Sequence, residues 1–178
     1  SRIKNIHHIE SMAHLTCVGH SKNEIDGMLD SMREIGLENV LALRGDPPAN
    51  QPDFDFLKGA YKYAYDLIEH IRKSSDICIA AAAYVEGHVD SLRLSEDLKH
   101  LKRKVDAGTD LLVTQLFFDN RLYFDFIEKA RRIGINCPVE AGIMPVFRAD
   151  QIKSIAAKSG CSIPAKLVLV MDKYQDNP

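Results

Sequence analysis

Short apolar runs alternate with longer amphipathic stretches along almost the whole chain. The runs are rich in Val, Ile, Leu, Ala and Cys, a composition typical of β-strands that are covered on both faces of a sheet. They are AHLTCVG (13–19), NVLALRGD (39–46), DICIAAAAY (76–84), DLLVTQLFF (110–118) and CPVEAGIMPV (137–146). Five runs in series predict five strands.

The stretches between the runs have the apolar spacing of amphipathic helices. In residues 21–36, Ser21 followed by Glu24 predicts a capping box at the start, and Gly36 predicts the end. The other predicted helices cover 57–73, 92–107, 120–133 and 149–159, and Gly108, Gly134 and Gly160 stand just past three of them. Strand–helix units in series predict a parallel α/β sheet.

Regular spacing, with polar residues at the strand exits, favours a TIM barrel, the (β/α)8 fold, over an open doubly wound sheet. The absence of a GxGxxG phosphate loop from the sequence also favours the barrel. A complete barrel has eight units and about 250 residues. We therefore expect residues 1–178 to be a single domain that forms part of a barrel, with about five β/α units.

The composition is that of an ordinary globular protein, with 46% hydrophobic and 27% charged residues. A net charge of −2 argues against a general nucleic-acid or acidic-membrane binder. No apolar run reaches the roughly 20 residues that span a bilayer, and no secretion signal is visible. Four widely spaced cysteines without a CxxC pair predict reduced thiols, no metal site and a cytoplasmic location; they are Cys17, Cys78, Cys137 and Cys161.

Polar residues stand on or just after the predicted strands. Because the carboxyl ends of parallel strands meet at one rim, we expect these side chains to gather there and to hold a large polar heterocycle. No serine or cysteine nucleophile motif for acyl transfer is present. The rim residues are His14, Arg44, Asp46, Tyr84, Glu86, His88, Gln115 and Pro145.

Two of these positions have a structural alternative. Arg44 and Asp46 could form an internal salt bridge, but Gly45 between them favours a ligand, since glycine permits positive φ or a close approach of the backbone. Gln115 lies within an apolar run, and an unpaired buried amide costs about 1–3 kcal/mol. Either another strand or a ligand is therefore expected to satisfy it.

The stretch 94–108 predicts a helix with a buried stripe of Leu94, Leu98, Leu101 and Val105. Its charged residues form either a solvated face or a surface along which a diphosphate and a ribose lie. They are Asp97, His100, Arg103 and Lys104.

Five motifs in order give the chain a family resemblance. AHLTC, LALRGDPP, YVEGH, DLKHLKRKVDAGTDLLVTQLFFD and AGIMPV together resemble methylenetetrahydrofolate reductase, an FAD-dependent barrel enzyme of one-carbon and methionine metabolism. The resemblance implies that the first two strands and the last strand of the family's barrel are not in this chain. The family's acid, a glutamate on the first strand, therefore has no counterpart here.

The resemblance also implies roles for individual residues. Asp46 is expected near the pyrimidine edge of the flavin, and Gln115 is expected to bind the folate pterin and to help place the nicotinamide. Ile155 falls where some members carry an aromatic residue that packs on the folate. The residues expected to bind FAD are His14, Leu43, Arg44, Gly45, Asp46, Tyr63, Ala64, Tyr84, His88, Asp97, His100, Arg103 and Lys104.

The implied reaction is a ping-pong transfer of hydride from NAD(P)H through FAD to methylenetetrahydrofolate, catalysed by Asp46 and Gln115 in a cytoplasmic homo-oligomer. One alternative is a non-catalytic module of the same fold that binds FAD, folate or a protein partner. Another is a barrel enzyme for a phosphorylated substrate, which the missing glycine loop near the late strands disfavours.

Overall fold

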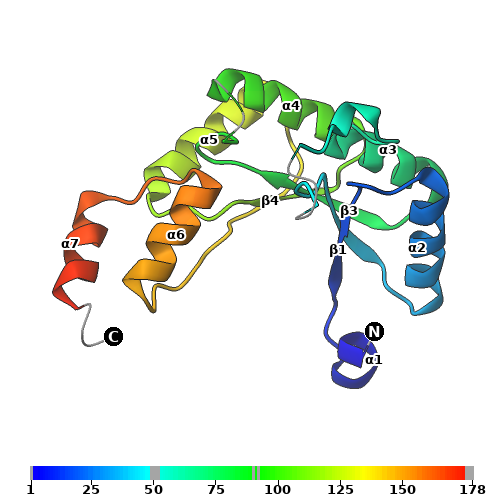
Figure 1. The fold of residues 1–178 in the computed structure, drawn as a ribbon, viewed down its shortest axis with the longest axis horizontal. Helices are drawn as coiled ribbons and strands as arrows, with labels where there is room; N and C mark the ends of the chain where they lie inside the picture. Colours follow the sequence, from blue (N-terminus) through cyan, green and yellow to red (C-terminus); the bar gives the residue numbers. More distant parts are fainter. Residues whose placement is uncertain (1, 49–52, 90, 92, 175–178) are drawn as a thin grey trace. The chain divides into compact units, whose positions relative to one another are not determined.

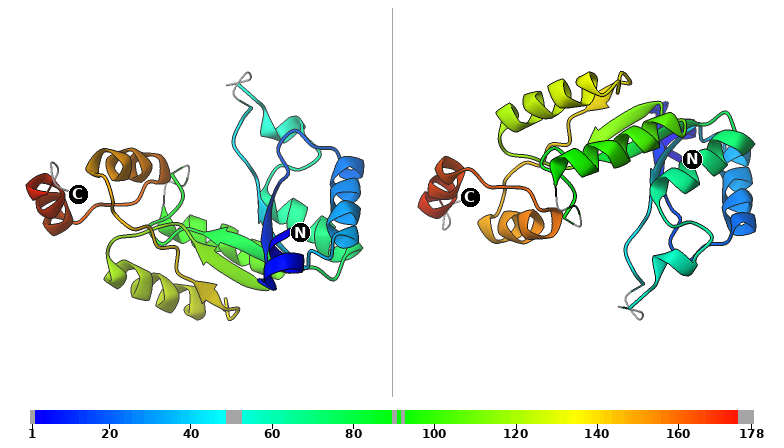
Figure 2. Two further views of the ribbon diagram at one scale, coloured as in Figure 1. Left: turned by 90° about the horizontal axis from the view of Figure 1, so that it is seen from below. Right: turned by 90° about the horizontal axis from the view of Figure 1, so that it is seen from above.

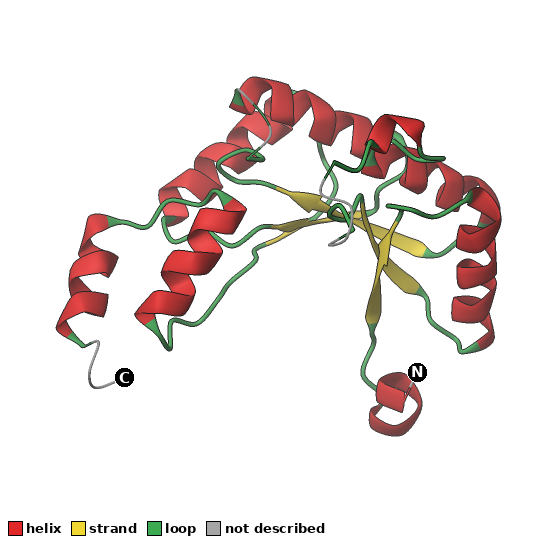
Figure 3. Ribbon diagram, viewed as in Figure 1, coloured by secondary structure: helices red, strands yellow, loops and turns green. Residues whose placement is uncertain are grey.

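The computed structural model describes residues 2–48, 53–89, 91 and 93–174. Strands and helices alternate along this part of the chain (Figures 1 and 3). It divides into two compact units, which we call the first unit (1–82 with 103–112) and the second unit (83–102 with 113–178). The single domain over 1–178 stays a prediction.

The first unit holds the strands β1 and β2 and most of β3. Strand β1 (Met12–Thr16) pairs in parallel with β2 (Asn39–Leu43), and β2 pairs in parallel with β3 (Cys78–Ala83). In this register Thr16 lies opposite Leu43, and Ala42 lies opposite Ala81. The strands β1 and β2 therefore end side by side.

Helices of the first unit lie beside these strands. They are α1 (Arg2–His7), α2 (Lys22–Glu34), the 3-10 helix η1 (Phe56–Lys58) and α3 (Ala64–Ser74). Helices α2 and α3 run next to one another (Figures 1 and 2), and Nε2 of His70 on α3 lies 2.8 Å from Oδ1 of Asp26 on α2. The apolar spacing of α3 explains its packing, because Leu67, Ile68 and Ile71 are all completely buried.

Helix α4 (Leu94–Asp106) and strand β4 (Leu111–Thr114) contribute residues to both units. The remaining elements belong to the second unit and are α5 (Asn120–Arg132), β5 (Val139–Glu140), α6 (Ala149–Ser159) and α7 (Ala165–Lys173). Helices α6 and α7 are neighbours in Figures 1 and 2, and Nζ of Lys153 lies 3.5 Å from Oδ1 of Asp172. The core of this unit includes Phe126, which is 1% exposed.

The five strands follow chain order in the sheet, β1-β2-β3-β4-β5. This is the order expected of successive β/α units, and it confirms the predicted parallel α/β class. None of the helices in the described ranges is long and apolar enough to cross a membrane.

Helix ends agree well with the sequence predictions. Ser21 and Glu24 form the predicted capping box, with Ser21 N–H donating to Glu24 Oε2 at 2.7 Å. The hydrogen bonds from Ser21 lower the pKa of Glu24. All four glycines predicted to follow helices have positive φ; they are Gly36, Gly108, Gly134 and Gly160.

Several predicted elements differ from the structure in their bounds. Strand β4 (Leu111–Thr114), for example, is shorter than the predicted run 110–118. The predicted helix 57–73 begins only at Ala64, because Asp66 accepts hydrogen bonds from the N–H groups of Lys62 and Tyr63 and so caps α3 there. In the predicted strand 137–146 only Val139–Glu140 is a strand. Pro138 and Pro145 lack the N–H that a ladder needs. The predicted helix 92–107 starts at residue 94 in the structure, and Leu92 lies outside the described residues.

Helix α7 was not predicted from the sequence. Its stretch AKLVLVMDK is short, and Met171 is its buried residue. No disulfide joins the four cysteines, all of which lie in the described ranges. The helical stripe predicted for 94–108 is confirmed in part, since Leu98 and Leu101 are buried while Leu94 and Val105 are half-buried.

Candidate functional site

The exits of β1 and β2 are joined by backbone hydrogen bonds beyond the strands themselves. Cys17 N–H donates to the carbonyl of Leu43 at 3.1 Å, and Val18 N–H donates to the carbonyl of Arg44 at 2.9 Å. Leu43 is half-buried at the end of β2. The loop that carries the predicted Arg44–Asp46 motif is therefore fixed to its neighbour.

Gly45 adopts the conformation that the sequence indicated. Its φ is +87°, which is in the left-handed region. A Cβ at this position would lie 2.6 Å from Cγ1 of Val18 and 3.0 Å from Cβ of Thr16. The close approach is thus to the β1 exit, and glycine is required for both backbone conformation and packing.

The side chains on either side of Gly45 diverge in their contacts. Cζ of Arg44 lies 4.4 Å from the ring centroid of Phe56, a cation–π arrangement. Asp46 is exposed, and within the described residues its carboxylate has no hydrogen bond or ion pair. The alternative of an internal Arg44–Asp46 salt bridge is therefore wrong, and the Asp46 carboxylate is open to a ligand.

Strand β1 and the residue that follows it, Cys17, contribute two chemically different groups. His14 is exposed and lies opposite Leu41 of β2. Cys17, 2% exposed, donates through Sγ to the carbonyl of Arg44 at 3.6 Å. Burial raises the pKa of the Cys17 thiol to about 11. Cys17 is therefore a neutral packing residue, and His14 is the group on β1 that a ligand can reach.

The start of α3 positions Tyr63 and Ala64. Asp66 Oδ2 accepts from Lys62 N–H at 2.9 Å and from Tyr63 N–H at 3.0 Å, which fixes the backbone just before the helix. Ala64 is buried at 8% exposure, whereas the Tyr63 side chain remains 40% exposed. The backbone at Tyr63 is rigid while its ring faces outward.

The ring of Tyr65 brings together two predicted flavin contacts. Its centroid lies 5.2 Å from that of Tyr63 with the planes at 19°, and Cζ of Arg103 lies 5.0 Å from it. Tyr65 was not among the residues predicted from the sequence. The signal for it was the alternation of tyrosines in YKYAYDL, which places Tyr63 and Tyr65 two residues apart.

The charged residues of α4 do not form one uniform face. Lys104 donates through Nζ to the carbonyl of Ala82 at 2.9 Å, and Arg103 is exposed. Asp97 is 8% exposed and accepts from Ser91 Oγ at 3.2 Å. A wholly solvated face is therefore wrong for Asp97 and Lys104.

His100 is exposed on the same helix. Of the four residues predicted to meet a ribose and a diphosphate, Arg103 and His100 are the most open to solvent. Lys104 and Asp97 already have partners within the protein. Their part in binding stays a prediction.

In the second unit, the exit of β3 carries an aromatic pair. The rings of Tyr84 and His88 meet edge to face, with centroids 4.6 Å apart and planes at 83°. Glu86 between them accepts from Ser162 N–H at 3.0 Å. The structure thus brings Tyr84 and His88 together, and it gives Glu86 a role in holding the loop before α7.

Gln115 lies just past the end of β4 and is half-buried. The prediction that Gln115 lies within the strand is therefore wrong, because β4 ends at Thr114. The backbone N–H of Gln115 donates to the carbonyl of Ala83 at 2.7 Å, and the side-chain Oε1 accepts from the backbone N–H of Leu116 at 2.8 Å. Within the described residues the side-chain NH₂ has no hydrogen-bond partner, so it can donate to a ligand beside the β3 exit.

The AGIMPV segment is held by the strand before it. Gly142 N–H donates to Thr114 Oγ1 at 2.8 Å, and Thr114 is buried at 4% exposure. Ile155 is half-buried on α6. Its predicted contact with folate stays a prediction.

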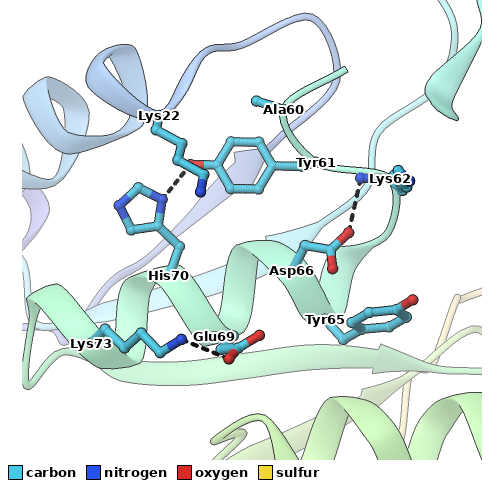
Figure 4. A pocket seen from close by; sticks show the side chains of 9 residues that line it. All are labelled: Lys22, Ala60, Tyr61, Lys62, Tyr65, Asp66, Glu69, His70 and Lys73. Atoms are coloured by element: carbon cyan, nitrogen blue, oxygen red, sulfur yellow. Dashed lines mark hydrogen bonds and ion pairs between the residues drawn. The ribbon is translucent and has the colours of Figure 1, made fainter. Parts of the chain in front are cut away.

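A cleft of about 550 Å³ lies beside α3 in the first unit, and no residue of it was predicted (Figure 4). A hydrogen-bonded chain forms part of its wall: the Tyr61 hydroxyl meets Nδ1 of His70, whose Nε2 meets Asp26. Tyr61 is 3% exposed, and burial raises its pKa to about 12. These hydrogen bonds link α2, α3 and the segment before α3 to one another.

The predicted site residues are divided between the two units. The first unit holds His14, Leu43, Arg44, Gly45, Asp46, Tyr63, Ala64, Arg103 and Lys104, and the second holds Tyr84, His88, Asp97, His100, Gln115 and Ile155. A common rim that joins Asp46 and Gln115 stays a prediction.

Sequence comparison identifies one matching family. The family is methylenetetrahydrofolate reductase, and its sequence model matches residues 1–178. Methylenetetrahydrofolate reductase (NADH) 1 of Arabidopsis thaliana is 41% identical over 99% of the chain, and methylenetetrahydrofolate reductase 1 of Schizosaccharomyces pombe is 39% identical over 95%. The chain spans 32% of the length of the first relative and 28% of the second.

Two solved structures have a similar fold. One is a protein from Clostridium thermocellum that binds two copies of 5-methyl-5,6,7,8-tetrahydrofolic acid, with a TM-score of 0.51 and 11% identity over 99% of this chain and 82% of that one. The other is 2,3-dimethylmalate lyase, with a TM-score of 0.51 and 12% identity over 98% of this chain and 62% of that one. At these identities the likeness concerns the fold, and it confirms the predicted barrel type.

Proposed function

Because the chain belongs to the methylenetetrahydrofolate reductase family, we propose that it forms part of the catalytic barrel of a flavin-dependent reductase. The reaction is the reduction of methylenetetrahydrofolate to methyltetrahydrofolate by NAD(P)H. FAD, when bound, would accept hydride from the nicotinamide and deliver it to the folate.

One structural observation supports this proposal in addition to the family match. Tyr63, which precedes α3, and Arg103, on α4, both contact the ring of Tyr65. The family resemblance assigns both residues to FAD, although nothing in their sequence spacing requires them to be neighbours. Their proximity supports a shared ligand.

The exposed groups of the first unit fit the charge pattern of FAD. The Arg103 guanidinium is exposed and suits a diphosphate, with which arginine forms charge-assisted hydrogen bonds. The Asp46 carboxylate, with no partner in the described residues, would oppose negative charge that develops on a nearby ring. That opposition favours hydride transfer onward to the folate.

Gln115 suits a different task in the second unit. Its Oε1 is held by Leu116 N–H, so the direction of the side chain is fixed while the NH₂ remains able to donate. A fixed amide donor orients a heterocycle without carrying charge. We assign it to the pterin of the folate and to the nicotinamide, one after the other.

Cofactor binding provides the first test. Purified chain mixed with FAD and passed through a desalting column should retain the yellow flavin. Arg103→Gln should weaken FAD binding about tenfold, as the loss of a charge-assisted contact. The matched control is Lys99→Gln, an exposed cation on the same helix. Folded chain that retains no flavin would contradict the proposal.

The half-reactions provide the second test, by stopped-flow absorbance of the flavin. Asp46→Asn should slow reoxidation by methylenetetrahydrofolate more than reduction by NADH, whereas Asp53→Asn, an exposed control, should change neither. Equal slowing of both steps would remove the electrostatic role of Asp46. Flavin binding without any turnover would support a non-catalytic binding module instead.

A further inference from the structure

Tyr65 holds two side chains that are otherwise unsupported. Within the described residues, the ring of Tyr65 is the one aromatic or charge contact of the Tyr63 ring, and it is also the one such contact of the Arg103 guanidinium. Tyr63 is 40% exposed and Arg103 is exposed. Without Tyr65, both side chains would be free to sample several rotamers in solvent.

Tyr65 itself is well anchored. It is the second residue of α3 and is half-buried, and Figure 4 shows it next to Asp66, which fixes the backbone before the helix. Burial raises the pKa of the Tyr65 phenol, although the nearby Arg103 charge acts in the opposite direction. The ring therefore projects from a helix start whose backbone is held by hydrogen bonds, and part of the ring is shielded from solvent.

We propose that Tyr65 is a positioning residue for FAD, which preorganises Tyr63 and Arg103 through one aromatic ring. This inference rests on the proposed function. Tyr63 would meet the flavin portion and Arg103 the diphosphate, so one ring would couple contacts at two parts of the same cofactor. Ordering two such side chains only at binding would lower affinity on the order of tenfold.

The contact depends on the ring and not on the hydroxyl, since stacking and cation–π attraction both act through the ring face. Tyr65→Phe should therefore bind FAD within about twofold of the native chain, whereas Tyr65→Leu should bind it about tenfold more weakly. A matched control is Tyr174→Leu, which removes a ring that lies 5.2 Å from Nζ of Lys173 in the second unit.

The experiment is fluorescence titration of FAD into the native chain, the three tyrosine variants, Arg103→Gln and the double variant Tyr65→Leu/Arg103→Gln. The effects of Tyr65→Leu and Arg103→Gln should be less than additive, because each removes the same contact. NMR of the ligand-free chain should show a ring-current shift of the Arg103 Nε–H that Tyr65→Phe keeps and Tyr65→Leu loses.

The two hypotheses fail in different ways. If the folded native chain does not bind FAD, the proposed function fails and this inference fails with it. If the native chain binds FAD but Tyr65→Leu binds as tightly, or if the two variants are additive, the inference alone is overturned. If Tyr65→Leu does not fold, Tyr65→Phe decides. A native FAD affinity together with a native ring-current shift of the Arg103 Nε–H supports the inference, and a tenfold loss of affinity in Tyr65→Phe overturns it.

Discussion

Replacing Gly45 with alanine tests why the Arg44–Asp46 loop has its shape. Two costs apply to this substitution. The φ of +87° places a non-glycine residue in the left-handed region, which costs about 1–2 kcal/mol. The new Cβ would also lie 2.6 Å from Cγ1 of Val18 and 3.0 Å from Cβ of Thr16, and such overpacking costs about 1–3 kcal/mol. We expect Gly45→Ala to lower the free energy of unfolding by about 2–5 kcal/mol.

The chain provides a matched control that separates the two costs. Gly19 has a φ of +74° but open space around its Cβ position, so Gly19→Ala should show the backbone cost alone. Val18→Ala removes both methyl groups of Val18, including the Cγ1 that lies nearest to the new Cβ, and combining it with Gly45→Ala should recover about 1 kcal/mol relative to additivity.

The assay is urea unfolding followed by circular dichroism, with equal slopes among the variants as the condition for comparison. A loss for Gly45→Ala no larger than that for Gly19→Ala would refute the packing argument. Additivity of Gly45→Ala with Val18→Ala would show that the Val18 methyl group is not the obstacle.

Three other outcomes are expected. Gly142→Ala would place a Cβ 2.1 Å from the carbonyl oxygen of Thr114, so it should cost at least about 2 kcal/mol in urea unfolding; a neutral result would contradict the close approach. Tyr61→Phe should cost about 1 kcal/mol, because it removes the hydrogen bond to His70 but keeps the ring; a loss near zero at neutral pH would show that this bond adds no stability. Stability should also fall at alkaline pH, because burial raises the pKa of Tyr61 from 10 to about 12 and the pKa of Cys17 from 9 to about 11. The unfolded chain therefore loses these protons at lower pH than the folded chain does. Unfolding measured from pH 8 to 12 should show a shallower decline in Tyr61→Phe and in Cys17→Ala, and an unchanged decline would mean that neither group is buried in the neutral form.

Strands β1 to β3 could be predicted because buried parallel strands have a distinctive apolar composition, whereas only Val139–Glu140 of the predicted strand 137–146 is a strand. Strand β2 (Asn39–Leu43) lies within the predicted run 39–46, and Gly45 has the positive φ that the sequence allowed; both are local features. The capping box at Ser21 is local in the same sense. Such features depend on residues a few positions apart, which a single sequence displays directly.

Gln115 shows where that reasoning failed. The apolar residues around it suggested a buried strand position with two ways to satisfy the amide, namely another strand or a ligand. In the structure Oε1 accepts from the N–H of the next residue, Leu116, so the amide is partly satisfied within its own loop. Hydrogen bonds between a side chain and an adjacent backbone group compete with strand pairing, and sequence spacing does not reveal them.

Tyr65 shows what the sequence could not provide. Its meeting with Arg103 depends on how α3 and the end of α4 pack, and no periodicity connects the two positions. The Tyr61–His70–Asp26 chain likewise depends on the packing of α3 against α2. Contacts of this kind follow from tertiary structure, so they appear only once the elements are placed.

The hydrogen bonds that continue beyond β1 and β2 have a consequence for motion. Because Cys17 N–H and Val18 N–H donate to carbonyls of the Leu43–Arg44 segment, these two amides are protected as if they belonged to the sheet. Exchange of these two amides with deuterium should then require separation of β1 from β2. Their exchange rate should be close to that of the slowest-exchanging amides in the two strands. The loop that carries Asp46 is already held by these hydrogen bonds before any ligand binds. Binding of a ligand at Asp46 should therefore slow deuterium uptake at Cys17 and Val18 very little.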